Sequence, residues 1–166
     1  MDQIAFTHED CNGEPPSRLP LRLYKYRSLE RFDRIVDILL KKRFYAAKLC
    51  ELNDPMEGVF AAPQVHPVFV AGIKSAAQQW RVCSFSKTAD NVCQWAYYAD
   101  GFKGICIEIV MQTPAPFEWE EVQYHPVSGL MDIPPEYADL IRLFPQRTLR
   151  WKAKDWKREQ EVRICT

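Results

Sequence analysis

Hydrophobic residues along the chain recur with the period of a helix in some segments and in short β-favouring runs in others. The segment 21–26 is a short run of leucine and tyrosine around Arg22 and Lys25, which is typical of a strand. Ser28 follows it and is a suitable helix N-cap. Further on, apolar residues lie at the spacing of one helix face, at Phe32, Ile35, Val36 and Leu39. The pattern predicts a strand from Leu21 and then a helix.

The same reasoning divides the rest of the chain into alternating short elements. Apolar runs and alternation predict strands at 44–47, 81–85, 105–110, 120–124 and around 162–164. Helical spacing predicts helices at 73–80, 92–99 and 137–144. Residues 1–20, rich in proline with little periodicity, predict an irregular leader. We therefore expect one α+β domain over 21–166, a twisted mixed or antiparallel sheet with packed helices.

The C-terminal strand carries its charges in an alternating pattern. Val162 and Ile164 share one face, and Glu159, Glu161 and Arg163 share the other. This alternation aims two carboxylates in the same direction.

Composition narrows the class of protein. The 47% hydrophobic and 13% aromatic fractions are those of a globular chain, and Lys+Arg and Asp+Glu are equal at 22 each. A charge balance of this kind gives no strong nucleic-acid footprint. The sequence contains no apolar run near the ~18 residues of a membrane span, no secretion signal and no C-x-x-C pair among its six cysteines. We expect a cytoplasmic protein with reduced thiols and no membrane partner.

Several motifs occur in a fixed order along the chain: LYKYRS, LNDPMEG, VCSFSKTADNVCQWAYYADGFKGICIEI and WKREQEVRI. Together they resemble a bacterial family of domains of unknown function, over about Leu23 to Ile164. The resemblance implies a toxin or a phage-defence effector.

The order of polar motifs also resembles the ADP-ribosyltransferase fold. In that fold an early strand carries Arg or His, a Ser-x-Ser strand comes midway and a Glu-x-Glu strand comes late. The matching positions here are Arg27, Ser84, Ser86, Glu159 and Glu161. The resemblance implies a split sheet. The chain departs from the arginine-modifying branch in having Phe85 where that branch has Thr. It also has no identifiable substrate-recognition loop before the EQE segment at 159–161.

The resemblance further implies an NAD cofactor and assigns roles to these side chains. Arg27 would contact a phosphate, Glu161 would bond the ribose hydroxyl and stabilise positive charge, and Glu159 would orient or deprotonate the acceptor. Ser84 would hold Glu161 in place. Stacking on nicotinamide or adenine, and the remaining cofactor contacts, would fall to Tyr26, Ser86, Trp95 and Tyr98.

Each of these residues also has a structural interpretation. Arg27 could be an arginine paired with Glu161, and the glutamates could form a solvated strand face answered by Lys157, Arg158 and Arg163. Ser84 and Ser86 could be a strand end and a helix N-cap. Trp95, Tyr97 and Tyr98 could belong to the core, and Cys83 could be a buried strand cysteine.

The first function class is an enzyme that transfers ADP-ribose from NAD to an unknown macromolecular acceptor. The sequence leaves two other classes open. One is a non-catalytic module that binds a nucleotide or a peptide in the same pocket. The other is a metal-dependent nuclease built around Mg²⁺ from Asp54, Glu57, Glu108 and Glu161. For Asn53, Asp54 and Glu57 we favour a turn over a cation site, because Asn-Asp-Pro is turn chemistry.

Overall fold

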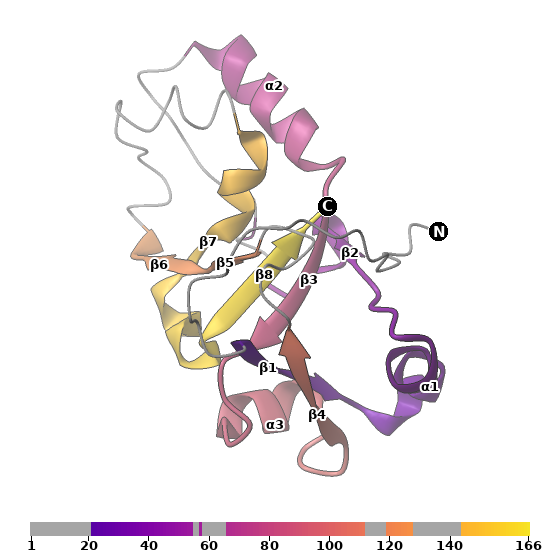
Figure 1. Ribbon diagram of the computed structural model, residues 1–166. Coiled ribbons are helices and arrows are strands. Elements are labelled where there is room, and N and C mark those ends of the chain that lie inside the picture. Colours follow the sequence, from indigo (N-terminus) through magenta and orange to yellow (C-terminus); the bar gives the residue numbers. More distant parts are fainter. Residues whose placement is uncertain (1–20, 55–56, 58–65, 112–118, 128–143) are drawn as a thin grey trace, which may run out of the picture.

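The computed structural model describes residues 21–54, 57, 66–111, 119–127 and 144–166 (Figure 1). The predicted leader at 1–20 lies outside these residues, as does all but the last residue of the helix predicted at 137–144.

The first elements follow the predicted order of strand and helix. Strand β1 is Leu21–Arg27, a 3-10 turn η1 is Leu29–Arg31 and helix α1 is Phe32–Lys41. The Ser28 hydroxyl accepts from the Glu30 amide, which caps this segment as expected. The predicted apolar face is only partly right, because Phe32 is 62% exposed whereas Ile35 and Ile38 are buried.

The remaining elements are short. The strands are β2 (Ala47–Lys48), β3 (Arg81–Ser86), β4 (Ile105–Met111), β5 (Trp119–Glu121), β6 (Gln123–His125), β7 (Trp151–Ala153) and β8 (Glu161–Cys165). The helices are α2 (Pro67–Ala77) and α3 (Val92–Tyr98), with 3-10 turns η2 (Leu49–Glu51), η3 (Pro145–Arg150) and η4 (Lys154–Glu159). No described helix has the length and apolar character that crossing a bilayer requires.

Two predicted boundaries are wrong for identifiable reasons. Helix α2 begins at Pro67 and ends at Ala77, where a helix at 73–80 was predicted, because proline is well suited to a first helical turn. The single strand predicted at 120–124 is two strands, β5 and β6. Between them the Val122 amide donates to the Glu161 carbonyl at 3.0 Å. Strand β5 then pairs with β8, and β6 pairs with β7 in a separate parallel ribbon.

The main sheet has the strand order β4-β1-β3-β8-β5, and every neighbouring pair is antiparallel. Strand β2 also pairs with β3, antiparallel and off this path. Helices and an antiparallel sheet confirm the α+β class.

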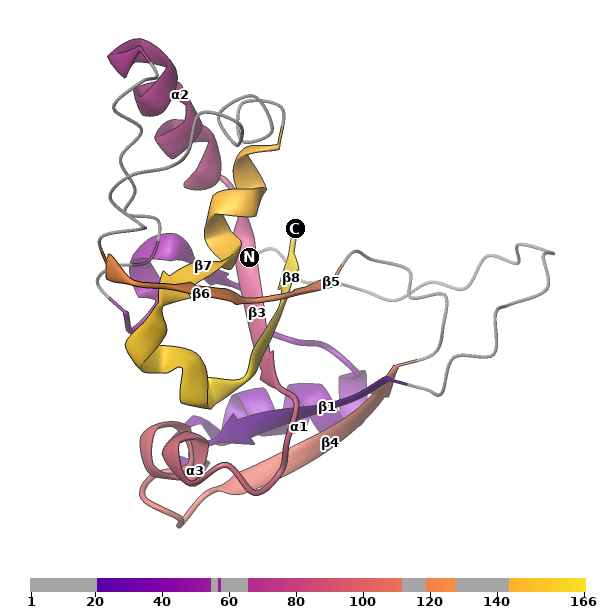
Figure 2. The ribbon, with the colours of Figure 1, turned by 90° about the vertical axis from the view of Figure 1, so that its left-hand side faces the viewer.

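Strand pairing is incomplete along one edge of β3. Strand β1 meets β3 at the partners Tyr24 and Ser86, and β2 meets the other end of β3 at Val82 and Arg81. Figure 2 shows β1 and β4 running at a steep angle to β3 and β8. The middle of the β3 edge, from Cys83 to Phe85, therefore has no register partner in β1 or β2.

The two faces of the β3–β8 pair differ in chemistry. One face is apolar and contributes Cys83, Phe85, Val162 and Ile164 to a core with Leu23, Ala46 and Met111. The opposite face carries Ser84, Ser86, Glu161 and Arg163, with Ser86 opposite Glu161 and Ser84 opposite Arg163. The alternation predicted for the last strand is confirmed at these positions.

Candidate functional site

A cavity of about 190 Å³ lies beside the unpaired stretch of β3. Its lining includes residues 24–27 of β1, Ala47 of β2 and residues 82 and 84–86 of β3, so the three strands that flank the gap all border it. Helices and turns contribute Arg34, Glu51, Gln94, Tyr98 and Glu159, and β7 and β8 contribute Lys152 and Glu161.

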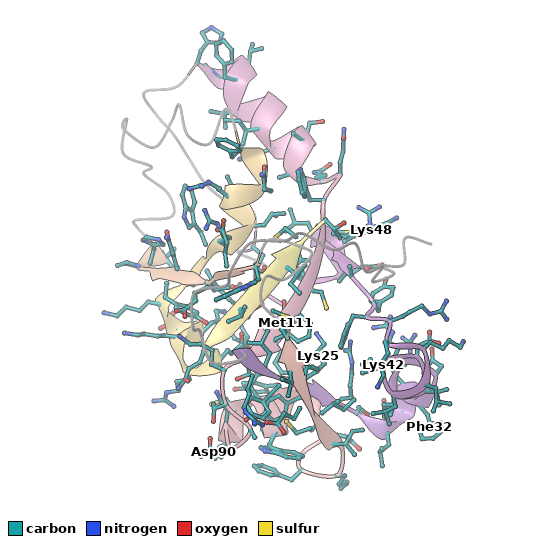
Figure 3. The ribbon with its side chains drawn as sticks, in the orientation of Figure 1. Lys25, Phe32, Lys42, Lys48, Asp90 and Met111 are labelled. Atoms are coloured by element: carbon teal, nitrogen blue, oxygen red, sulfur yellow. The ribbon has the colours of Figure 1, made fainter. Side chains whose placement is uncertain are left out.

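Three cations, Lys25, Arg27 and Arg34, belong to the lining of this cavity, and we call them the cationic wall. Lys25 is labelled in Figure 3 near the place where β1, β3 and β4 converge. Its Nζ donates a hydrogen bond to the backbone carbonyl of Ser84. Burial lowers the pKa of Lys25 to about 8. Arg34 lies over the Tyr45 ring, 3.8 Å from its centroid.

Arg27 is the cation of this wall with the poorest local compensation. Its Nε is buried and has no hydrogen-bond partner in the described part of the chain. Burial lowers the pKa of the Arg27 guanidinium, and the neighbouring Arg34 and Arg31 lower it further. A buried donor without a partner is suited to an anionic ligand.

Four buried charges of the lining, Glu57, Lys152, Glu159 and Glu161, interlock with the buried Arg163, which is not in the lining. We call these five residues the charge network. Lys152 Nζ lies 2.6 Å from Glu159 Oε2, 3.1 Å from Glu161 Oε2 and 3.3 Å from Glu57 Oε1. Arg163 also bridges two glutamates, with Nε donating to Glu161 Oε1 at 2.7 Å and Nη2 to Glu57 Oε1 at 2.8 Å. The Leu149 carbonyl accepts from the third nitrogen, Nη1.

Glu161 is the carboxylate of the network whose pKa is lowered. Burial alone would raise its pKa, but Arg163 and Lys152, with a contribution from Ser84, bring the pKa down to about 2. The carboxylate is 3% exposed and its backbone amide donates to the Tyr124 hydroxyl at 2.9 Å. It is therefore a fixed negative charge on the cavity wall.

Glu159 has the opposite tendency. Burial raises its pKa above the ordinary value although Lys152 and Tyr98 act in the other direction. The Tyr98 hydroxyl donates to Glu159 Oε1 at 2.8 Å and accepts from Asn53 Nδ2 at 2.7 Å. The Asn53 side chain therefore binds the Tyr98 hydroxyl.

The sequence-predicted site residues mostly border the same cavity. Arg27, Ser84 and Glu161 come from three different strands and all line it, together with Tyr26, Ser86, Tyr98 and Glu159. Trp95 is absent from the lining. Its Nε1 donates to the Ala89 carbonyl at 2.9 Å and its ring stacks on Phe102.

Several details differ from the sequence interpretation. Glu159 belongs to η4, because Gln160 takes a left-handed backbone that ends the turn before β8 begins. Tyr26 packs edge-on against Trp95, and its hydroxyl donates to the Thr88 carbonyl at 2.7 Å. The Ser86 hydroxyl donates to the Glu159 carbonyl at 3.0 Å.

Of the structural interpretations of these residues, some are wrong and one is confirmed. The solvated glutamate face is wrong, because Glu159 and Glu161 are buried while Lys157 and Arg158 are exposed. Ser86 is not a helix N-cap, since Asn91 caps α3 through the amides of Cys93 and Gln94. Pairing of Arg27 with Glu161 is not found in the described residues. Cys83 is 1% exposed in β3, as its structural interpretation predicts.

The four acids named for a metal-dependent nuclease do not form one site. Glu108 lies on β4 in an exposed ion pair with Arg22, whereas Glu57 and Glu161 are bound to Lys152 and Arg163. Across the described ranges, no group of three or more histidine, cysteine, aspartate or glutamate side chains could hold a metal ion.

Sequence reasoning missed Lys152 and the true position of Glu57. Lys152 is 2% exposed yet stands among the charges of WKAKDWK, where nothing marks it as interior. Glu57 was assigned to a turn or a cation site, and its carboxylate is instead a partner of Arg163. For Arg163 a signal existed, because it lies between the apolar residues Val162 and Ile164.

A scan against protein-family models found no match for this chain, and neither curated proteins nor solved structures gave one.

Proposed function

We propose that the chain is an NAD-dependent ADP-ribosyltransferase-like enzyme whose substrate enters the cavity lined by the cationic wall and by the glutamates of the charge network. The observation that carries this proposal is the buried, unpartnered Arg27 Nε in a cavity also lined by Ser84 and Glu161. An anionic cofactor would supply the acceptor that this donor lacks. NAD, as the substrate, supplies the ADP-ribosyl group when its bond to nicotinamide breaks.

The residues have separate tasks in this proposal. Arg27 binds a phosphate, and Lys25 adds positive charge to the same wall. Glu161 stabilises the positive charge that develops on the ribose, because its low pKa keeps it ionised at any physiological pH. Ser84 supports Glu161 from the adjacent strand β3.

The size of the cavity limits what it can enclose. Sites for ligands of drug size have volumes of roughly 300–1,000 Å³, and this one has about 190 Å³. We therefore expect the nicotinamide and ribose end of NAD to occupy the cavity, with the adenosine end outside it. Trp95, which is not in the lining, is omitted from the proposed cofactor contacts.

The biological setting follows from the motif resemblance and is part of the same proposal. We infer a bacterial toxin or phage-defence effector that acts in the cytoplasm, where NAD is abundant. Its partners would be this dinucleotide and a macromolecular acceptor whose identity the resemblance leaves open.

The test is to incubate the purified protein with NAD and measure nicotinamide release. We expect E161Q to lower kcat by about 10²–10³-fold, because a fixed charge at the developing cation is lost. R27M should weaken NAD binding by about tenfold to a hundredfold, the effect of one charge-assisted hydrogen bond. R22M, on the exposed side of the same strand, is the matched control and should bind NAD normally.

Folding is checked in each variant by circular dichroism and thermal unfolding, since E161Q removes a partner of two buried cations. S84A is the second variant, because it weakens the support of Glu161 without removing a charge. Absence of NAD binding to the wild-type protein by calorimetry would overturn the proposal.

A non-catalytic nucleotide-binding module is the second candidate. It is favoured by one feature of the network: both Glu161 oxygens already accept from Arg163 and one also contacts Lys152. Calorimetric binding of NAD without nicotinamide release, weakened in R27M and unchanged in E161Q, would select this candidate over the enzyme.

A further inference from the structure

Glu159, the residue assigned to the acceptor, borders the cavity, but its carboxylate is almost fully buried and already bound by groups of the protein. It is 2% exposed, and each of its carboxylate oxygens already has a donor. Oε1 accepts from the Tyr98 hydroxyl at 2.8 Å, and Oε2 accepts from Lys152 Nζ at 2.6 Å. An incoming hydroxyl would therefore need another group to reach this base.

Tyr98 occupies the intermediate position. It lines the cavity and is only partly buried, unlike Glu159. A phenol has one proton to donate and two lone pairs that accept. The proton is directed to Glu159, and one lone pair accepts from Asn53 Nδ2 at 2.7 Å. One lone pair of the Tyr98 oxygen is left for a hydroxyl in the cavity.

We propose that Tyr98 relays the proton of the acceptor hydroxyl to Glu159. This inference rests on the proposed function, and its acceptors are water or a hydroxyl-bearing molecule. The acceptor oxygen forms a bond to C1′ of the NAD ribose while the bond from C1′ to nicotinamide breaks and its electron pair leaves with nicotinamide. The acceptor proton passes to Tyr98 Oη, and the Tyr98 proton passes to Glu159 Oε1.

The electrostatics of the site agree with this direction of transfer. Burial and the negative charge of Glu159 raise the pKa of Tyr98, so the phenol stays neutral and keeps its proton until the moment of transfer. Burial also raises the pKa of Glu159, which makes it a better base than an exposed carboxylate. Glu161 stays ionised, so the two carboxylates have different roles.

Asn53 gains a role from the same contact. Its amide fixes the rotation of the Tyr98 hydroxyl by occupying one acceptor direction, and it comes from the LNDPMEG motif that the sequence interpretation assigned to a turn. Asn53 is in this proposal a positioning residue that acts through Tyr98.

The relay is tested with Y98F, with NAD as donor and water as acceptor. We expect kcat for nicotinamide release to fall by about 10²-fold or more, while KM for NAD changes less than about threefold. Y97F is the matched control, because Tyr97 is 66% exposed, contacts Trp156 and lies outside the cavity lining; it should retain wild-type kcat.

A pH profile separates a relay from a structural role. In the wild type, kcat should fall on the acid side as Glu159 becomes protonated, and Y98F should lose this acid limb. The groups that set the Glu159 pKa are Tyr98, Lys152 and Glu161, and in the variant only the first has changed. A Y98F enzyme with the wild-type kcat and acid limb would overturn the relay and leave the proposed function standing.

A second readout does not depend on turnover. The Tyr98 hydrogen bond lowers the pKa of Glu159, so Y98F should raise the pH at which the side-chain carboxyl carbon of Glu159 titrates by NMR. An unchanged titration would overturn the relay because the hydrogen bond would be absent. No nicotinamide release from the wild type under any condition would overturn the proposed function and the relay together.

Discussion

The cationic wall and four of the five residues of the charge network line the same cavity, but the two groups differ in how their buried charges are balanced. In the network, Lys152 lies within 3.3 Å of three glutamates, and Arg163 contacts two of them. In the wall, Lys25, Arg27 and Arg34 form no ion pair with any described carboxylate. The network is therefore compensated by opposite charges within the protein, and the wall is not.

The difference separates support from recognition. A buried charge loses its hydration, and only partners within the structure or on a ligand can replace it. The network has those partners, so it holds Glu161 and Glu159 in place and adds little attraction for a further charge. The wall has no carboxylate partner among the described residues, only the Ser84 carbonyl at Lys25 and the Tyr45 ring at Arg34. An anion that reaches it should therefore be bound, and the ligand-free protein should be less stable because of the wall.

The largest expected effect comes from breaking the network. R163M removes the partner that Glu161 and Glu57 share, and we expect the free energy of unfolding to fall by about 3–5 kcal/mol, because two acids lose their cation in the interior. Urea unfolding followed by circular dichroism measures this change.

The matched control is K41M, because Lys41 pairs with Asp37 at 2.9 Å on the surface of α1, where its side chain is 56% exposed. We expect K41M to change stability by less than about 1 kcal/mol. Equal losses in R163M and K41M would show that the network does not carry the buried charge that the structure assigns to it.

The second prediction uses pH to separate the two regions. Burial lowers the pKa of Lys25 to about 8 from an ordinary 10.5, so between these values the unfolded chain binds more protons than the folded one. The free energy of unfolding therefore rises with pH across that window because of Lys25. The low pKa of Glu161 acts in a different window: its stabilisation is present above pH 4.5 and is lost as the pH falls towards 2.

The variant K25M isolates the alkaline window. A pKa difference of about 2.5 corresponds to ~3.4 kcal/mol, and partial exposure with loss of the bond to the Ser84 carbonyl reduces this to about 2. We expect K25M to be more stable than the wild type at pH 7 and equal to it, or slightly less stable, near pH 10.5. A difference that stays constant over this range in urea titrations would contradict a desolvated Lys25.

Part of the fold could be predicted from the sequence because the last strand alternates between apolar and charged side chains. Val162 and Ile164 against Glu161 and Arg163 give the faces of β8 directly, and the spacing over residues 92–99 gives α3. The splaying of β1 from β3 could not be predicted, since it depends on β2 pairing with the far end of β3. Local pattern does not encode such long-range competition for one strand edge.

The candidate site was predictable only in part. Arg27, Ser84 and Glu161 were found through their order along the chain, and all three line the cavity. Lys152 was not found, because its burial depends on the carboxylates of Glu159, Glu161 and the distant Glu57, and local pattern does not show that these surround it. The roles expected for Tyr98 and Trp95 were based on ring stacking against a cofactor. In the structure the Tyr98 hydroxyl donates to Glu159, and the Trp95 ring stacks on Phe102.

The smallest effect should have the opposite sign to the first, and it is the sharpest test of the wall. R27M replaces a desolvated guanidinium by an apolar side chain of similar length, so the ligand-free protein should gain about 1 kcal/mol as a buried, unpartnered donor is removed. The control R22M, on the same strand with a side chain 58% exposed and paired to Glu108, should gain nothing. Thermal unfolding with and without NAD then measures stability and recognition together: NAD should raise the Tm of the wild type and should raise the Tm of R27M much less at the same concentration. If R27M lost stability while the ligand-induced increase stayed intact, Arg27 would be a structural arginine, and the unpaired wall would have no part in recognition.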